Sequence, residues 1–326
     1  MSDEPLFDLF SFARRGPGDR ITLSAGEIVQ ISRTVSRTPE VVVKVLPRGA
    51  SSLGAVQAHL GYIGREGEVN LETDDGEILR GKDAGNKLLV DWNLELIEQR
   101  GKPNLTSTTT KQPPKLVHKV TFSMPPGTQP DKVHAAVRNF AREEFGLKHR
   151  YVMALHTDEP HPHVHLVIRA VSDQGQRLHI KKATLREWRA GFAHHLRELG
   201  VPANATQRHV RGETRPRKAD GIYRAMSRGE STHLRNRVEV VRGELMKGKW
   251  QVESGKAKLL RTREEVRCGW LAVGDVLAHQ GHPEIAAQVK RYVEQMPKPL
   301  TEKEYVATKL LERTREPRVR KIVMVR

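Results

Sequence analysis

Hydrophobic residues recur within residues 40–200 with the two periods that distinguish strands from helices. Apolar residues at helical spacing begin at Leu53, and a capping box at Thr184–Glu187 predicts the start of a helix that ends near Leu199. Runs rich in β-branched residues predict strands over 40–46, 116–123, 151–156, 163–171 and 177–180. Further helices are expected over 88–99 and 130–146. This order of elements predicts an α+β fold, in which helices pack on a mostly antiparallel sheet.

The pattern changes on both sides of this region. The first residues include an Arg-Arg-Gly-Pro-Gly sequence that breaks regular structure, and we expect a poorly ordered tail there. After the α+β region the chain becomes strongly basic and then shows charged helical patterns. The expected organisation is a tail over 1–38, an α+β domain over 39–205, a basic segment over 206–230 and a helical C-terminal region over 231–326.

Histidines gather where two predicted strands meet. The sequence His156-Thr-Asp-Glu-Pro-His161-Pro-His163-Val-His165 joins the strand that ends at His156 to the strand that begins at His163. Side chains alternate across a strand, so His163 and His165 face the same way, and an antiparallel hairpin brings His156 beside them. Neutral imidazole is a common metal ligand, and three histidines leave coordination positions open for a substrate. We predict a metal site formed by His156, His163 and His165.

Other residues of the cluster are expected to support the metal ligands. His161, His163 and His165 form an alternative ligand set, but the prolines that flank His161 take it out of the strand ladder. We therefore place His161 and Glu159 beside the ligands, where they can accept or donate hydrogen bonds to the rings. Asp158 is expected either to orient a histidine or to act as a base. A polar hairpin with adventitious metal affinity is the simpler alternative.

The amino-acid composition indicates the kind of partner and the cellular compartment. The net charge of +17, from 56 lysines and arginines against 39 acidic residues, favours a nucleic-acid phosphate backbone as the partner. The single cysteine excludes an intramolecular disulfide and fits a reducing cytoplasm. The chain lacks an apolar run of the roughly 18 residues that a membrane span needs, so we expect no membrane insertion.

Several motifs together resemble the HUH endonucleases, and in particular the MobA-type relaxases, which are mobilisation nucleases. The histidine sequence is similar to the third motif of that family. Ala58-His-Leu-Gly-Tyr62-Ile-Gly-Arg-Glu-Gly67 resembles the first motif, and His118–Thr128 resembles the second. The resemblance implies an HUH relaxase-like fold and a divalent metal, with Mg²⁺ or Mn²⁺ in use and Zn²⁺ as another possibility. It also implies Tyr62 as the nucleophile that forms a covalent 5′-phosphotyrosine intermediate.

The same resemblance implies partners and a role in conjugative mobilisation of a plasmid or integrative element. The substrate would be single-stranded DNA at an origin of transfer, and relaxosome accessory proteins and a type IV secretion coupling protein would assist. Tyr223 is a rival nucleophile, or a residue that stacks on a base. The residues expected to contact DNA are Ser123, Thr128, Lys181, Lys182, Arg208, Arg211, Arg215, Arg217, Lys218 and Tyr223.

Two other functions fit part of this pattern. A rolling-circle replication initiator shares the HUH site, but it usually carries a helicase or a second tyrosine close to the first, and neither is visible in this sequence. A non-enzymatic, metal-stabilised nucleic-acid-binding protein would need the histidines for stability alone. Alanine at His163 and His165 distinguishes these cases, because it abolishes cleavage in an enzyme and chiefly lowers thermal stability in a binding protein.

Overall fold

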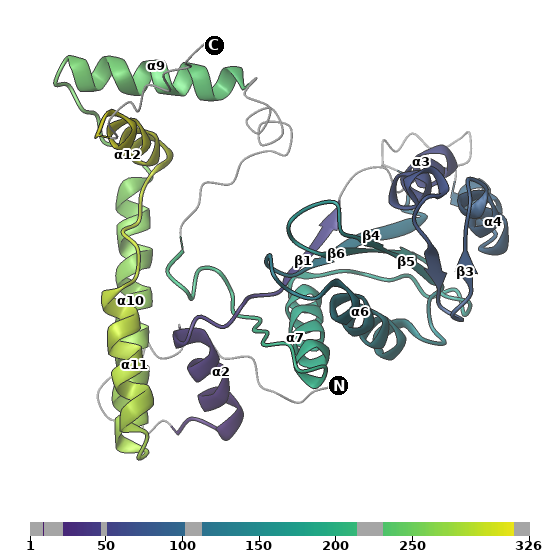
Figure 1. The fold of residues 1–326 in the computed structure, drawn as a ribbon, viewed down its shortest axis with the longest axis horizontal. Helices are drawn as coiled ribbons and strands as arrows, with labels where there is room; N and C mark the ends of the chain where they lie inside the picture. The colour runs from purple at the N-terminus through teal and green to yellow at the C-terminus, as the bar shows by residue number, and fades with distance from the viewer. Residues whose placement is uncertain (1–8, 10–21, 47–50, 102–112, 214–230, 316–326) are drawn as a thin grey trace, which may run out of the picture. The chain divides into compact units, whose positions relative to one another are not determined.

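The computed structural model describes residue 9 and residues 22–46, 51–101, 113–213 and 231–315 (Figure 1). The described residues belong to two compact units. One unit lies within Arg37–Ala205, and the other combines residues of Pro5–Ser36 with residues of Thr206–Arg326.

The first unit is built on a six-stranded antiparallel sheet. Its strand order is β1-β4-β6-β5-β2-β3, so the two strands with the histidines lie at the centre. The inner strands over 117–123, 151–156 and 163–169 are almost entirely buried, whereas the edge strand over 42–46 is exposed on one face. The strands are β1 (Val42–Leu46), β2 (Leu71–Thr73), β3 (Ile78–Leu79), β4 (Val117–Ser123), β5 (Tyr151–His156) and β6 (His163–Arg169).

One face of the sheet holds an aromatic core. Helices α6 (Pro130–Phe145) and α7 (Lys182–Glu198) cover this face (Figure 1). Phe140 lies 5.1 Å from Phe122 of β4 and 6.2 Å from Trp188 between ring centroids, in tilted and edge-on arrangements. Burying such rings stabilises the fold because it removes apolar surface from water and allows edge-to-face contacts between the rings.

Helices on the opposite face leave a polar region at one end. Helices α3 (Leu53–Ile63), α4 (Ala84–Asp91) and α5 (Leu94–Gly101) pack there on aliphatic residues of β4, β5 and β6. A short 3-10 turn, Arg65–Gly67, follows α3. Gly67 has a φ of 98°, and a Cβ there would lie 2.5 Å from the backbone carbon of Gly81. Another stretch of backbone therefore approaches Gly67 too closely for any larger residue to fit.

The α+β fold is as predicted, with local differences. The helix expected over 88–99 is two helices, because Asn93 adopts a φ of 50° and ends α4. Strands β2 and β3 occupy residues that looked only charged and turn-rich. The strand expected over 177–180 is reduced to an isolated bridge between Val171 and Arg177. Helix α7 begins at Lys182, ahead of the capping box expected at Thr184–Glu187.

The second unit is helical. Residues 22–38 were expected in a poorly ordered tail, but they include α2 (Ala25–Val35). Ser24 and Glu27 form a capping box, and Ile31 is buried in a core with Trp270, which explains the order. The other helices are α9 (Thr232–Met246), α10 (Lys256–His279), α11 (Pro283–Glu294) and α12 (Glu302–Arg315).

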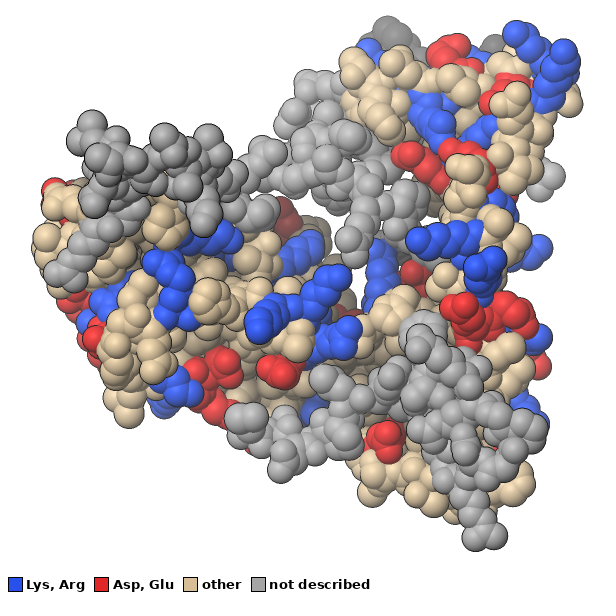
Figure 2. Space-filling model, turned by 180° about the vertical axis from the view of Figure 1, so that it is seen from behind, with Lys and Arg blue, Asp and Glu red and all other residues tan. Residues whose placement is uncertain are grey.

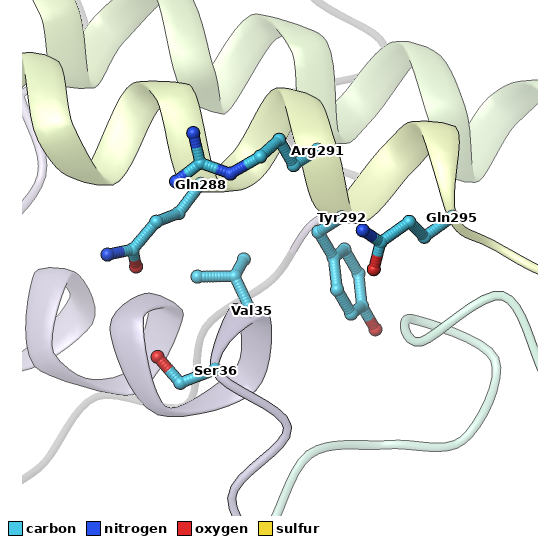
Figure 3. Close-up of a pocket in the computed structure, with 6 residues that line it drawn as sticks. All are labelled: Val35, Ser36, Gln288, Arg291, Tyr292 and Gln295. Carbon is cyan, nitrogen blue, oxygen red and sulfur yellow. The ribbon is translucent and has the colours of Figure 1, made fainter.

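A small pocket lies between α2 and α11 of this second unit (Figure 3). Val35 and Ser36 form one wall, and side chains of α11 form the other. The Oε1 atom of Gln288 is buried there without a hydrogen-bond partner. The pocket contains none of the residues predicted to act on DNA.

Basic and acidic side chains interleave over the visible face of the molecule in Figure 2. The net charge of +17 is therefore not collected into one basic surface on that face. No helix of the described ranges is both long and apolar enough to cross a bilayer.

Candidate active site

The hairpin of β5 and β6 brings three histidines together. His156 pairs with His163 across the two strands, and His165 lies two residues further along β6 on the same face. One ring nitrogen of each histidine lies within 4.8 Å of the others. The ring centroids are 4.7 Å apart for His156 and His165 and 5.2 Å apart for His163 and His165.

Hydrogen bonds orient each ring. His156 Nε2 donates to the carbonyl of Ile63 at 2.7 Å, so Nδ1 carries the lone pair, which faces Arg65 Nη2 at 3.3 Å. His163 Nδ1 donates to the carbonyl of His161 at 3.2 Å, which leaves Nε2. His165 Nδ1 lies 3.4 Å from the hydroxyl of Thr121, and its Nε2 is buried without a partner. Fixing the other ring nitrogen in this way selects the tautomer that binds a metal.

Burial favours the neutral form of two of these rings, and the neutral form is the one that binds a metal. The pKa of His165 is lowered to about 3, first by burial and then by His156 and His163. Burial likewise lowers the pKa of His156. An orphaned buried nitrogen and three converging imidazoles fit a divalent cation, and His156, His163 and His165 are the residues that would hold it.

Helix α3 places Tyr62 beside the histidines. Its ring centroid lies 5.8 Å from that of His165 and 6.1 Å from that of His156. The side chain is 50% exposed, so a large substrate can reach it. Tyr151 is only 2% exposed, and burial raises its pKa to about 12, as a core residue should show. Tyr223, the rival nucleophile, lies outside the described residues.

Two residues of the site were not predicted. His59, one helical turn before Tyr62, stacks on its ring at 6.0 Å, and burial with Lys119 lowers the pKa of His59 to about 4. Arg65 lies 5.2 Å above the Tyr62 ring, and its Nη2 is 3.3 Å from His156 Nδ1. Helical spacing from Tyr62 was a signal for His59. The position of Arg65 depends on its φ of 47°, which no local sequence signal indicates.

The carboxylates make contacts other than those expected. Asp158 forms an ion pair with Arg65, rather than a hydrogen bond with a histidine of the described chain. Asp158 thus holds the guanidinium group that lies 3.3 Å from His156 Nδ1, and its negative charge also opposes the lowering of the pKa of His156. Glu159 pairs with His161 Nε2 at 2.8 Å, and His161 supports His163 through its backbone carbonyl.

The expected DNA-binding residues are scattered. Ser123 lies opposite His163 on the metal face, but its hydroxyl donates to the carbonyl of Met124. The Thr128 hydroxyl donates to the carbonyl of Pro125 at 2.9 Å, which is a turn-capping contact. Lys181 and Lys182 are exposed at the start of α7, which covers the opposite face. Leu178, which precedes them in the chain, donates a backbone hydrogen bond to Ala170, just after the C-terminal end of β6. His163 lies at the other end of that strand.

The remaining candidates belong to the basic segment. Arg208 and Arg211 lie in the second unit, 3.7 and 3.5 Å from Glu213. The others, Arg215, Arg217, Lys218 and Tyr223, lie outside the described residues.

Comparisons with known proteins identify the region that holds the histidines. Residues 82–201 match the family described as "Relaxase: MobA/VirD2-like, nuclease domain". This chain contains a relaxase nuclease domain of the MobA/VirD2-like family. The matched range includes His156, His163 and His165 but begins after Tyr62, which the fold brings beside these histidines from outside the range.

Curated relatives point the same way. The T-DNA border endonuclease VirD2 of Agrobacterium fabrum (strain C58 / ATCC 33970) is 22% identical over 214 residues, which cover 60% of this chain and 46% of that protein. VirD2 of Rhizobium rhizogenes is 26% identical over 137 residues, 40% of this chain and 30% of that protein. This chain thus spans less than half the length of these relatives.

A solved structure described as "Molecular Basis of Vancomycin Resistance Transfer in Staphylococcus aureus" aligns with 52% of this chain and 99% of its own. It shares 13% identity with this chain at a TM-score of 0.34.

Proposed function

We propose that this relaxase cuts one strand of DNA at an origin of transfer and remains joined to it through Tyr62. The observation that carries the proposal is the half-exposed Tyr62 ring, 5.8 Å from His165 in a cluster of three converging histidines. A metal site alone would suit a hydrolase, which needs only water as its nucleophile. A tyrosine beside the histidines favours transfer of the strand to the protein.

The reaction is a transesterification. The Oη atom of Tyr62 loses its proton to solvent or a base and attacks the scissile phosphorus, forming the Oη–P bond. The P–O3′ bond breaks, and the leaving oxygen takes a proton to become a 3′ hydroxyl. The phosphate stays on the tyrosine as a 5′-phosphotyrosine diester. Because one ester replaces another, the step needs no oxidant and no cysteine.

The charged residues around Tyr62 assist this step. A divalent cation held by His156, His163 and His165 would supply Lewis acidity to a non-bridging phosphate oxygen. Arg65 lies over the Tyr62 ring and pairs with Asp158, so its cation is placed where the phenolate and the phosphate charge develop. We assign Asp158 the role of positioning Arg65, in place of a direct contact with a histidine.

A covalent-capture assay tests this function. The full chain is incubated with Mn²⁺ or Mg²⁺ and a single-stranded library made from the DNA element that carries its gene, and adducts are separated on a denaturing gel. Wild type is expected to form an adduct that Tyr62→Phe does not form. Adduct formation by Tyr62→Phe at the rate of wild type would refute Tyr62 as the nucleophile.

The wider system remains a set of predictions. We expect such a nuclease to act on a plasmid or integrative element. Its expected protein partners are relaxosome accessory proteins and a coupling protein. Recovery of origin DNA in the captured adduct would identify the element directly.

A further inference from the structure

The metal face of the sheet continues past the histidines onto β4 and β1. Opposite residues of antiparallel strands point to the same face, so the register assigns each side chain to a face. His165 pairs with Thr121, and Thr121 pairs with Lys44, which gives a row from the metal site to the edge strand. In the next row Val167 pairs with Lys119. Thr121, Lys44 and Lys119 therefore lie on the face of His165.

This part of the face carries cations and hydroxyl groups without acids. None of the residues that the described strands β1, β4, β5 and β6 place on it is aspartate or glutamate. Lys44 is exposed at the edge, and Thr121 is partly exposed between it and the histidines. An acid-free strip of this kind, next to a metal site, is complementary to phosphate.

Lys119 is the least expected member of the strip. Lys119 is only 8% exposed, and no ion pair joins it to a carboxylate of the described chain. Burial of the unpaired charge lowers the pKa of Lys119. Lys119 also lies close enough to lower the pKa of His59, the residue stacked on Tyr62. Partial burial disfavours the charged form of Lys119, and a bound anion would offset the hydration that its ammonium loses.

We propose that Lys44 of β1 and Lys119 and Thr121 of β4 bind phosphates of the DNA strand that lies beside the metal site. The proposal rests on the proposed function, because it assigns the path of the DNA strand to β4 and β1. The sequence-based expectation placed the phosphate contacts at Ser123, Thr128, Lys181, Lys182 and the basic segment, and it included neither Lys44 nor Lys119. Neighbouring strands are about 4.8 Å apart, so Lys44 lies on the order of 10 Å from β6. That distance is within reach of phosphates close to the one that reacts.

The test is the salt dependence of single-strand binding. Fluorescence anisotropy of a labelled oligo(dT) of about 20 nucleotides gives the Kd of the full chain at several salt concentrations. Each lost phosphate contact lowers the slope of log Kd against log salt by about 0.7. The double variant Lys44→Gln/Lys119→Met should therefore lose about 1.4 from the slope and bind about 25-fold more weakly at ~0.1 M salt. Lys119→Arg, which keeps the charge, should retain the wild-type slope.

A matched pair on the other face controls for net charge. Lys132→Gln/Lys148→Gln removes the same number of charges from α6 and the turn that follows it, and α6 covers the opposite face of the sheet. This variant should bind like wild type. An unchanged slope in Lys44→Gln/Lys119→Met, or an equal loss in both double variants, would overturn the proposal. If the double variant does not fold, Lys44→Gln at the exposed edge still tests it, with an expected loss of about 0.7.

The outcome is independent of the covalent chemistry. Formation of the Tyr62 adduct together with an unchanged salt slope would remove the phosphate strip and leave the relaxase function standing. A lower salt slope in Lys44→Gln/Lys119→Met, together with no adduct in wild type, would support the phosphate strip and contradict the relaxase function.

Discussion

The two faces of the central sheet are built from the same strands and serve opposite purposes. Along β6, Val164 and Leu166 point into the aromatic core under α6 and α7, while His163 and His165 point to the face of α3. The first face is largely apolar, although Nδ1 of His118 is also buried there without a hydrogen-bond partner. On the second face, the unpartnered Nε2 atoms of His165 and His59 lie beside a cluster of three converging histidines and Tyr62. The comparison shows a fold stabilised on one face and kept ready for a ligand on the other.

The largest expected effect is chemical and lies on the metal face. Tyr62→Phe removes only the hydroxyl, so the fold and the stacking on His59 should remain, while adduct formation falls on the order of 10⁴-fold. The rate of adduct formation and the melting temperature are measured together. A parallel loss of both would mean that Tyr62 is a structural residue, and the contrast between the faces would weaken.

The core face should respond only in stability. Phe192→Ala removes a ring that is fully buried 5.2 Å from Phe122, and such changes cost about 3–5 kcal/mol. Chemical denaturation of the variant measures this cost. In the fraction that stays folded, the metal affinity should equal that of wild type, and a weakened metal site would show that the two faces are coupled.

The metal ligands should respond in affinity. His165→Gln removes an imidazole ligand, and we expect Mn²⁺ binding by calorimetry to weaken about 100-fold or more. His118→Gln is the matched control, because His118 is also a buried histidine and burial lowers its pKa to about 4, but it points to the other face of β4. Equal losses in both variants would contradict a site centred on His165.

The unpartnered Nε2 atom of His165 predicts a variant that loses metal binding without losing stability. His165→Leu should abolish metal binding and leave the metal-free protein as stable as wild type or slightly more stable, because it removes a buried polar atom that has no partner. Thermal melting in the presence of a chelator measures this. A large destabilisation would mean that the histidine contributes to the fold itself.

The smallest effect is a pH dependence. The pKa values of His165 and His59 are about 3 and about 4 in the folded protein, against 6.5 in the unfolded chain. The unfolded state therefore binds more protons between these values, so the stability is fully present above pH 6.5 and falls as the pH drops toward 4. The loss of melting temperature over that range should be smaller in His165→Leu. An equal loss would mean that other groups cause the acid sensitivity.

Sequence predicted those parts of the site that depend on local pattern. The hairpin with His156 and His163 follows from two apolar runs and a short turn, and α3 follows from helical spacing before Tyr62. The role of Arg65 could not be predicted, because it depends on left-handed backbone at Arg65 and Glu66. The acid-free strip was also invisible, because it appears only when the strand order is known.

The same limit explains the errors in the fold. Strands β2 and β3 are too short for their periodicity to be recognised, and β2 gains its stability by pairing with β5. Helix α2 is ordered because Ile31 packs on residues more than 200 positions later in the chain, such as Trp270. Long-range packing of this kind leaves no local signal.

The most direct measurement is the identity of the residue that carries DNA after cleavage. Captured adducts from the wild-type chain are digested with a protease and a nuclease, and mass spectrometry locates the nucleotide remnant. The remnant is predicted on the peptide that contains Tyr62, joined through a 5′ phosphate. A remnant on Tyr223, on another residue, or on a 3′ phosphate would contradict the central claim that Tyr62 and the three histidines form one site.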